Sequence, residues 1–180
     1  MSSRLPAVAF EQATGATAEV FQRIKKSVGR VPNAYATLGT HAPAALAVML
    51  QADAVLTSGA LSRQDQELIK LVVSEAAGCD YCVAAHTLVG KMTGLAPEAM
   101  RQARHGEPTG DALQDALVRF LNVLIRRPGT IPQAEYDAIR AAGYDERQLA
   151  DIALAVAVIT FTNVFNRIND TDVDFPAVAA

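Results

Sequence analysis

The residues best suited to chemistry lie in one short stretch, GCDYCVAAH, which runs from Gly78 to His86. This stretch contains both cysteines of the 180-residue chain and one of its three histidines. Cys79 and Cys82 have C-x-x-C spacing, and His86 follows Cys82 by four residues. The spacing fits a redox dithiol, half of a metal site, or two buried apolar cysteines that are neighbours in the chain.

A helix that begins at the C-x-x-C would bring these groups together. Residues four apart on a helix lie on one face, about 6 Å apart, so the His86 imidazole can reach the Cys82 thiol directly or through one water. Cys79, one turn earlier, is close enough to Cys82 to form a disulfide. Both sulfurs lie in or beside the first turn, where the helix dipole favours a thiolate. We therefore interpret Cys82 as a candidate nucleophile next to a base, and Cys79 as its resolving thiol.

Two other interpretations of the cysteines stay open. Free cysteine is commonly a small buried hydrophobe, although the spacing, the helix start and the histidine together disfavour that here. Zinc needs four ligands and C-x2-C-x3-H supplies three, so a catalytic zinc with an open position is a further alternative. Thioredoxin-like chemistry is disfavoured because no βαβ pattern surrounds the motif. We expect neither a metal nor a cofactor.

The elements around this stretch are predicted to be helices. Apolar residues recur with helical periodicity along almost the whole chain, without hairpin signals or an internal repeat. The sequence therefore predicts an all-α single domain over residues 1–180. Its parts are a helical arm (1–60), the motif helices (61–95), C-terminal helices (96–170) and an extended tail (171–180). The expected helices cover about residues 17–28, 33 onward, 43–57, 62–77, 79–92, 97–104, 111–127, 132–142 and 145–168.

Local signals set the ends of the helices that matter most. Ser62 can cap the helix before the cysteines, with Asp65 as the reciprocal half of a capping box, and Gly78 ends that helix. The segment 149–165 is apolar on nearly every helical face, which is typical of a buried or intersubunit helix. We expect from it a homo-oligomer.

Composition excludes several classes of protein. Hydrophobic residues make up 51% of the chain and charged residues 19%, which is typical of a globular domain. The net charge of −3 provides no basic field for nucleic acid or an anionic membrane. The N-terminal MSSRLPAVAFEQ lacks the apolar stretch of a signal peptide, and the longest apolar run falls short of the roughly 20 residues that span a bilayer. We expect a cytoplasmic protein without nucleic acid or membrane partners.

The stretch LSRQDQELIKLVVSEAAGCDYCVAAH, residues 61–86, resembles the core motif of the AhpD-like alkylhydroperoxidases, within the carboxymuconolactone decarboxylase superfamily. In that motif a helix with an acid beside an aliphatic run leads into C-x-x-C-x-x-x-H. VPNAY (31–35) and NVFNRINDTDVDFP (163–176) resemble, more weakly, the peroxidase-related branch of the family.

This resemblance implies an all-helical fold, oligomers whose helices pack between subunits, and peroxide reduction by a cysteine pair with a Glu/His proton relay. Carried onto this sequence, Cys82 corresponds to the peroxidatic cysteine, Cys79 to the resolving cysteine and His86 to the relay histidine. The relay glutamate lies twelve residues before the first cysteine, which is Glu67. Glu75 is a rival acid outside the motif position.

Two site residues allow simpler interpretations. The simpler interpretation of Glu67 is an exposed helix charge paired with Lys70 or Arg63. Tyr81 precedes Cys82, where the best-studied members of the family carry His, and it is either an accessory hydroxyl donor to peroxide or part of the core.

Five other polar residues could belong to a site. Asn163, Asn166 and Asn169 recur every three residues and would line the active-site mouth or form hydrogen bonds at a helix end or subunit interface. His41 is expected in a turn or on the surface, and His105 at the start of a loop near a helix C-terminus.

The leading hypothesis is a thiol-dependent (alkyl)hydroperoxide reductase. It would take a hydroperoxide as substrate and an unidentified thiol reductant of the lipoyl or thioredoxin type. One alternative is a carboxymuconolactone decarboxylase-type enzyme, whose acid–base chemistry needs no dithiol. The other is a non-enzymatic redox-responsive protein whose assembly changes when the disulfide forms.

Overall fold

The chain folds into helices joined by short connections. The computed structural model describes residues 3–178, and within that range it contains helices and no strand. The predicted all-α fold is therefore confirmed for the described residues. The elements are η1 (Phe10–Gln12), α1 (Gly15–Val28), α2 (Asn33–His41), α3 (Pro43–Thr57), α4 (Arg63–Ala77), α5 (Asp80–Met92), α6 (Pro97–His105), α7 (Ala112–Arg126), α8 (Gln133–Ala142) and α9 (Glu146–Asn169).

Most predicted boundaries agree with the structure to within one or two residues. Helix α3 has the expected ends, and α1 begins two residues earlier than expected, at Gly15. The short 3₁₀ turn η1 was not expected. His105 is the last residue of α6 instead of the first residue of a loop, because the helix ends only at Gly106, which adopts a left-handed conformation with φ +72°.

At the N-terminal cap of α4, one side chain serves both a local and a tertiary contact. The Ser62 hydroxyl oxygen accepts from the Asp65 backbone N–H at 3.0 Å, as predicted. The Asp65 carboxylate does not accept a hydrogen bond from the Ser62 backbone N–H. Its Oδ2 accepts the Ser62 hydroxyl proton at 2.7 Å, and its Oδ1 accepts from the Tyr144 hydroxyl at 3.1 Å. Only half of the predicted capping box forms, since a tertiary contact uses the second carboxylate oxygen.

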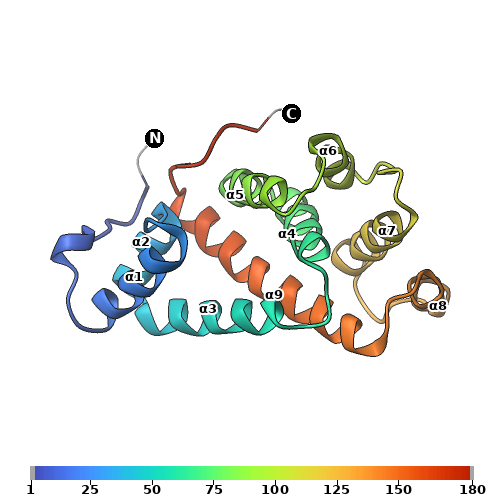
Figure 1. The fold of residues 1–180 in the computed structure, drawn as a ribbon, viewed down its shortest axis with the longest axis horizontal. Coiled ribbons are helices and arrows are strands. Elements are labelled where there is room, and N and C mark those ends of the chain that lie inside the picture. The colour runs from blue at the N-terminus through green and yellow to red at the C-terminus, as the bar shows by residue number, and fades with distance from the viewer. Residues whose placement is uncertain (1–2, 179–180) are drawn as a thin grey trace.

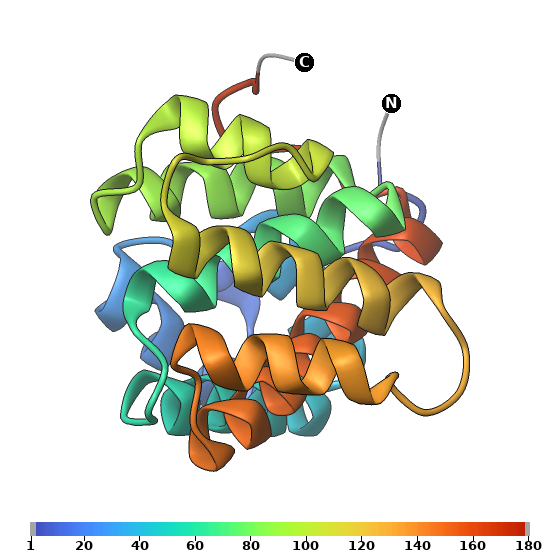
Figure 2. The same ribbon diagram turned by 90° about the vertical axis from the view of Figure 1, so that its right-hand side faces the viewer.

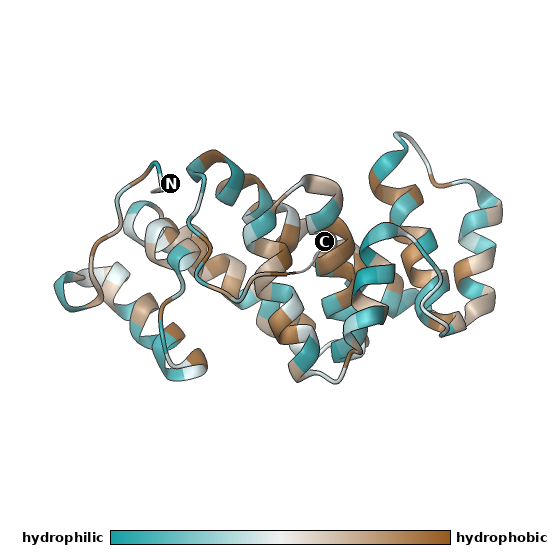
Figure 3. Ribbon diagram, turned by 90° about the horizontal axis from the view of Figure 1, so that it is seen from above, coloured by the Kyte–Doolittle hydropathy of each residue, from teal (hydrophilic) through white to brown (hydrophobic). Residues whose placement is uncertain are grey.

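Helix α9 runs diagonally through the molecule and connects its two ends (Figure 1). Helices α1 to α3 lie at one end and α4 to α8 at the other, with α7 and α8 side by side on the outer side in Figure 2. Helix α4 packs against α5, α6, α7 and α9, which makes it the centre of the larger apolar core. A smaller core lies among α1, α2 and α3. Hydrophobic and hydrophilic segments alternate along the helices, as amphipathic packing requires (Figure 3).

Helix α9 is long and apolar enough, by length and composition, to cross a membrane, a test that core helices also pass. It packs against α2, α3, α4 and α5. Part of its apolar surface stays exposed in the single chain, at Phe161, Val164 and Ile168. A homo-oligomer would cover such residues, and it stays a prediction.

The described part of the C-terminal tail passes between α2 and α5 (Figure 1). Asp174 accepts from the Tyr81 hydroxyl at 2.8 Å and pairs with Arg30. The Phe175 ring meets the Tyr81 ring edge-on, with centroids 5.4 Å apart. The tail therefore joins the N-terminal helices to the helix that carries the cysteines.

Candidate active site

The two cysteines lie at the start of α5, where the two residues Gly78 and Cys79 separate α4 from α5. Gly78 ends α4 in the left-handed conformation, φ +64°, which glycine adopts without the steric cost of a Cβ. Cys79 is the N-cap of α5, and Cys82 lies in its first turn. Both thiols are free and almost fully buried. The predicted helix start at the C-x-x-C is confirmed.

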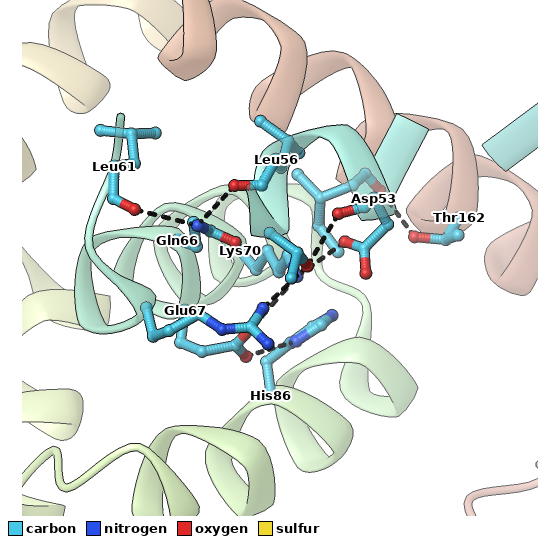
Figure 4. Close-up of polar contacts among 11 residues, drawn as sticks. Asp53, Leu56, Leu61, Gln66, Glu67, Lys70, His86 and Thr162 are labelled. Atoms are coloured by element: carbon cyan, nitrogen blue, oxygen red, sulfur yellow. Dashed lines mark hydrogen bonds and ion pairs between the residues drawn. The ribbon is translucent and has the colours of Figure 1, made fainter. Parts of the chain in front are cut away.

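The structure brings Glu67 and His86 into direct contact. Glu67 lies on α4 and His86 on the adjacent α5, and Glu67 Oε2 is 2.8 Å from His86 Nδ1 (Figure 4). The Glu67 side chain is 6% exposed and the His86 side chain 20% exposed. The sequence-predicted acid and histidine therefore form one buried pair.

Lys70 and Asp53 extend this pair into a row of four charged groups. Lys70 Nζ donates to Glu67 Oε1 at 3.1 Å and to Asp53 Oδ1 at 3.0 Å (Figure 4). The Lys70 side chain is only 9% exposed, whereas that of Asp53 is 40% exposed. The row Asp53–Lys70–Glu67–His86 is thus buried in its middle and reaches solvent at both ends. The simpler interpretation of Glu67 had the correct lysine partner, but it placed the pair on the surface.

The charges of this row decide the protonation of Glu67. Burial alone would raise the pKa of the carboxyl, but the attraction of His86 and Lys70 outweighs it and lowers the pKa from 4.5 to about 2. Burial opposes the charge of Lys70 as well, and the carboxylates of Glu67 and Asp53 raise its pKa. An ionised carboxylate only accepts hydrogen bonds. His86 therefore donates its Nδ1–H to Glu67, and its Nε2 is left for proton exchange.

Cys82 meets a different partner from the one that helical spacing suggested. Within residues 3–178, the His86 ring makes no direct hydrogen bond to Cys82 Sγ, because its Nδ1 is directed towards α4 by Glu67. The sulfur instead accepts from Asn166 Nδ2 of α9 at 3.2 Å. Asn166 is therefore the member of the predicted asparagine series that reaches the thiols.

The two thiols also contact each other. This hydrogen bond lowers the pKa of Cys79, whereas the same bond, together with burial, raises the pKa of Cys82. One negative charge shared by the pair is favoured, and a second charge on the same pair is opposed. In the resting pair the charge is favoured at Cys79, the N-cap of α5.

Two tyrosines, Tyr81 and Tyr35, lie in the same region of the molecule. The Tyr81 hydroxyl donates its one proton to Asp174 and accepts from the Ala34 backbone N–H at 3.1 Å, so it is directed to the tail. Tyr35 of α2, which the sequence did not single out, lies close to the site: burial first, then the charges of Asp53, Cys82 and Glu67, raise the pKa of its hydroxyl.

The remaining candidates lie apart from the thiols. Glu75 is 3.5 Å from Arg104 Nε, towards α6. Asn163 accepts from the Ser74 hydroxyl at 3.0 Å. His41 ends α2 and is exposed, and His105 is exposed at the end of α6.

The face of α5 opposite the thiols borders a cavity of about 230 Å³. Ala84, Thr87, Leu88 and Lys91 line it together with residues of α6 and the tail, a spacing that places them on the far side of the helix from Cys82. None of the sequence-predicted site residues lines this cavity. Among residues 3–178, no group of three or more His, Cys, Asp or Glu side chains is arranged to hold a metal ion.

The sequence signalled one neighbour of Glu67 but not the others. Lys70, named above as a candidate partner, follows Glu67 by three residues, which is a contact spacing on a helix. Asp53 lies on another helix, and the sequence offers no signal that it faces Lys70. The orientation of Asn166 towards the thiols depends equally on how α9 packs beside α5.

Comparison with known proteins agrees with this fold. The model of the Carboxymuconolactone decarboxylase family matches residues 42–121, which include the charged row and both cysteines. The uncharacterized protein YdfG of Bacillus subtilis (strain 168) is 25% identical over 134 residues, covering 71% of this chain and 86% of that protein.

Solved structures extend the similarity to almost the whole chain. An uncharacterized peroxidase-related protein with an alkylhydroperoxidase AhpD core, from Ralstonia eutropha JMP134, has a TM-score of 0.85 at 21% identity. The match covers 97% of this chain and 93% of that one. The debrominase Bmp8, in a complex with 2,3,4-tribromopyrrole, has a TM-score of 0.79 at 18% identity, again over 97% of this chain and 93% of that one.

The all-helical fold is that of the alkylhydroperoxidase AhpD core in the solved structure. The segment that the Carboxymuconolactone decarboxylase model matches includes the C-x-x-C and the charged row, which agrees with the resemblance of residues 61–86 to this superfamily.

Proposed function

We propose that the protein is a thiol-dependent hydroperoxide reductase of the peroxidase-related branch, with Cys82 as the peroxidatic cysteine and Cys79 as the resolving cysteine. The observation that carries the proposal is the buried 2.8 Å contact between Glu67 and His86, one helical turn from a pair of free thiols. A structural ion pair needs no adjacent dithiol, and an inert dithiol needs no oriented histidine.

The first step transfers one oxygen atom. The Cys82 thiolate attacks the distal peroxide oxygen, a sulfur–oxygen bond forms and the oxygen–oxygen bond breaks, which leaves Cys82 as a sulfenic acid. The departing alkoxide takes a proton and leaves as an alcohol, or as water when the substrate is hydrogen peroxide. Before attack, Cys79 is the nearest base for the Cys82 proton, since the thiols hydrogen-bond to each other and the charge is favoured at Cys79.

The charged row supplies the proton for the leaving oxygen. Glu67 holds His86 by Nδ1, so that Nε2 is the atom that donates to the alkoxide, directly or through a water. His86 then recovers a proton from solvent at its own exposed side. Lys70 keeps Glu67 ionised throughout this exchange, because it balances the carboxylate in a buried position.

The cycle closes with two exchange reactions. The Cys79 thiol, which holds the proton taken from Cys82, attacks the Cys82 sulfur and gives up that proton. A disulfide forms, the sulfur–oxygen bond breaks, and the sulfenic hydroxyl leaves with the Cys79 proton as water. An external dithiol then reduces the disulfide to two thiols and is itself oxidised. A lipoyl-bearing or thioredoxin-type donor has this chemistry, and we propose one of these classes as the reductant.

The test is mass spectrometry of the two cysteines before and after addition of hydroperoxide, with single-cysteine variants as matched controls. We expect a Cys79–Cys82 disulfide in the unaltered protein. Cys79→Ser should accumulate a sulfenic acid on Cys82 that dimedone traps, whereas Cys82→Ser should show neither product. Sulfenic acid on Cys79 in Cys82→Ser would show that Cys79 is the peroxidatic cysteine. If no hydroperoxide causes a loss of thiols, the proposed function is wrong.

The same experiment covers a halogenated substrate, since a debrominase has the same fold. Thiol oxidation by a brominated pyrrole, without oxidation by hydroperoxides, would change the proposed reaction to reductive debromination.

The family match also supports a second candidate, a carboxymuconolactone decarboxylase-type reaction. Here Glu67 and His86 would act as the acid–base pair, and the thiols would have no chemical part. Turnover of γ-carboxymuconolactone by the double variant Cys79→Ser/Cys82→Ser would support this reaction. An oxidation-dependent change in oligomer size without peroxide consumption would instead indicate a redox-responsive protein.

A further inference from the structure

The C-terminal end of α9 presents buried asparagines towards the interior of the molecule. Asn163, Asn166 and Asn169 are all buried, although α9 is otherwise rich in apolar residues. A buried amide is costly unless its polar atoms are hydrogen-bonded. Asn166 satisfies this requirement with an unusual partner, because its Nδ2 donates to the Cys82 sulfur at 3.2 Å.

A chain of hydrogen bonds fixes which end of the Asn166 amide faces the sulfur. The Leu5 backbone N–H donates to Asn169 Oδ1 at 2.8 Å, and Asn169 Nδ2 donates to Thr171 Oγ1 at 2.9 Å. The Thr171 hydroxyl then donates to Asn166 Oδ1 at 2.9 Å. A backbone N–H can only donate, so the donor and acceptor roles of Asn169 and Thr171 are fixed one after the other. The Asn166 oxygen is then the acceptor from Thr171, and the amide presents its N–H to Cys82.

We propose that Asn166 is a catalytic residue of this site, whose amide N–H stabilises negative charge on the Cys82 sulfur as the thiolate forms and attacks. The assignment rests on the proposed function in one respect, namely that Cys82 is the reacting atom. It names a residue on α9, outside the C-x-x-C segment and outside the charged row.

The chemistry of an amide suits this role. Hydrogen bonds from a neutral N–H to a charged acceptor are roughly twice as strong as those between neutral groups. The contact therefore strengthens when the thiol becomes a thiolate, which is the condition for a catalytic contribution. An amide N–H does not titrate near neutral pH, so Asn166 stabilises the charge without competing with His86 for the proton.

The position of Asn166 on one rigid helix makes the donor preorganised. Thr171 and Asn169 hold the amide in place, and the Thr171 backbone N–H also bonds to the Asn166 carbonyl at 3.1 Å. The reaction thus requires no reorientation of this group. This separates Asn166 from Asn163, one turn earlier, whose Oδ1 is bound to Ser74.

The test measures the thiolate directly, in a Cys79→Ser background that leaves Cys82 as the single thiol. The rate at which the small thiolate reagent methyl methanethiosulfonate modifies Cys82 is followed against pH, alongside the rate of Cys82 oxidation by hydroperoxide. We expect Asn166→Ala to move the midpoint of the reagent profile upward by about one to two pH units. The peroxide rate at pH 7 should fall about 10- to 100-fold.

Asn163→Ala is the matched control, because it removes an equally buried asparagine from the same helix without touching the sulfur. It should lower the melting temperature and leave the pH midpoint unchanged. Equal midpoints for Asn166→Ala and the Cys79→Ser parent, or equal shifts for the two asparagine variants, would overturn the assignment.

Thr171→Val gives an independent test if Asn166→Ala does not fold. It removes the hydroxyl that orients the amide and keeps the side-chain shape, so the midpoint should move in the same direction by about half a unit or less. An unchanged midpoint in a folded Thr171→Val protein would then overturn the assignment. Failure of Cys82 to react with peroxide in the parent would remove the proposed function, and the reagent profile would still decide whether Asn166 stabilises the thiolate.

Discussion

The polar groups on the two sides of Cys82 differ in kind. On the α3–α4–α5 side stands the row Asp53–Lys70–Glu67–His86, in which every member can carry charge. On the α9 side stands the chain Asn169–Thr171–Asn166, in which every member is neutral. The charged row reaches solvent at both ends, whereas the amide chain is buried throughout.

This difference separates two requirements of thiol chemistry. Proton transfer needs groups that titrate and that exchange with solvent, and a row with exposed ends meets that need. Stabilisation of a charge on sulfur needs a donor that is fixed and does not itself lose its proton, and a buried amide meets that need. The charged row comes from α3, α4 and α5, whereas the amide chain comes from α9 and from Thr171 in the tail that follows it.

The largest expected effect comes from breaking the charged row at its carboxylate. Glu67→Gln removes the carboxylate that orients His86 through Nδ1, so the peroxide rate should fall by about 10²- to 10⁴-fold. Stopped-flow measurement of Cys82 oxidation checks this. Glu75→Gln, on the same helix but bound to Arg104, should leave the rate within about twofold; similar losses in both variants would show that helix α4 is merely destabilised.

The second effect concerns stability in acid. Glu67 has a folded pKa of about 2 against 4.5 for the free group, so the unfolded chain binds its proton at higher pH. The stabilisation, about 3 kcal/mol, should be complete above pH 4.5 and disappear as the pH falls towards 2. Urea unfolding at a series of pH values should show this slope in the natural chain and a flatter one in Glu67→Gln. Parallel curves would contradict it.

A smaller effect is expected at the centre of the row. Lys70→Met keeps the length of the side chain but leaves the buried Glu67 carboxylate with His86 as its single partner, which should lower the free energy of unfolding by about 1–3 kcal/mol. The onset of acid unfolding should also move to higher pH, because the pKa of Glu67 rises without the ammonium group. Lys26→Met, an exposed change, is the control, and equal results from both variants would show that the buried ammonium group does not support Glu67.

The smallest effect is expected at Tyr81. A change at this residue tests whether its contact with the tail affects the reaction at Cys82. Tyr81→Phe removes the bonds to Asp174 and Ala34 and should lower the free energy of unfolding by about 1 kcal/mol. The rate of Cys82 oxidation should stay within about twofold, since the hydroxyl proton is directed to the tail. A tenfold loss of rate in a stable Tyr81→Phe protein would instead support the accessory role considered for this hydroxyl.

The local parts of this site follow from the amino-acid sequence. Helical periodicity, caps such as Ser62, and the single break at Gly78 set where α4 ends and where α5 begins. The motif resemblance then selected Glu67 and His86, and their contact follows once two consecutive helices pack side by side. These features depend on neighbours close in the chain, where backbone geometry leaves few alternatives.

The contacts between residues far apart in the chain depend instead on how the helices pack. Cys82 and Asn166 are 84 residues apart, Tyr81 and Asp174 are 93 apart, and Lys70 meets Asp53 across two helices. Such contacts depend on how α9, α3 and the tail rotate as they pack, and side-chain spacing in one segment does not specify that rotation. For the same reason the helical spacing of Cys82 and His86 did not show that the Cys82 sulfur accepts its hydrogen bond from Asn166 of α9.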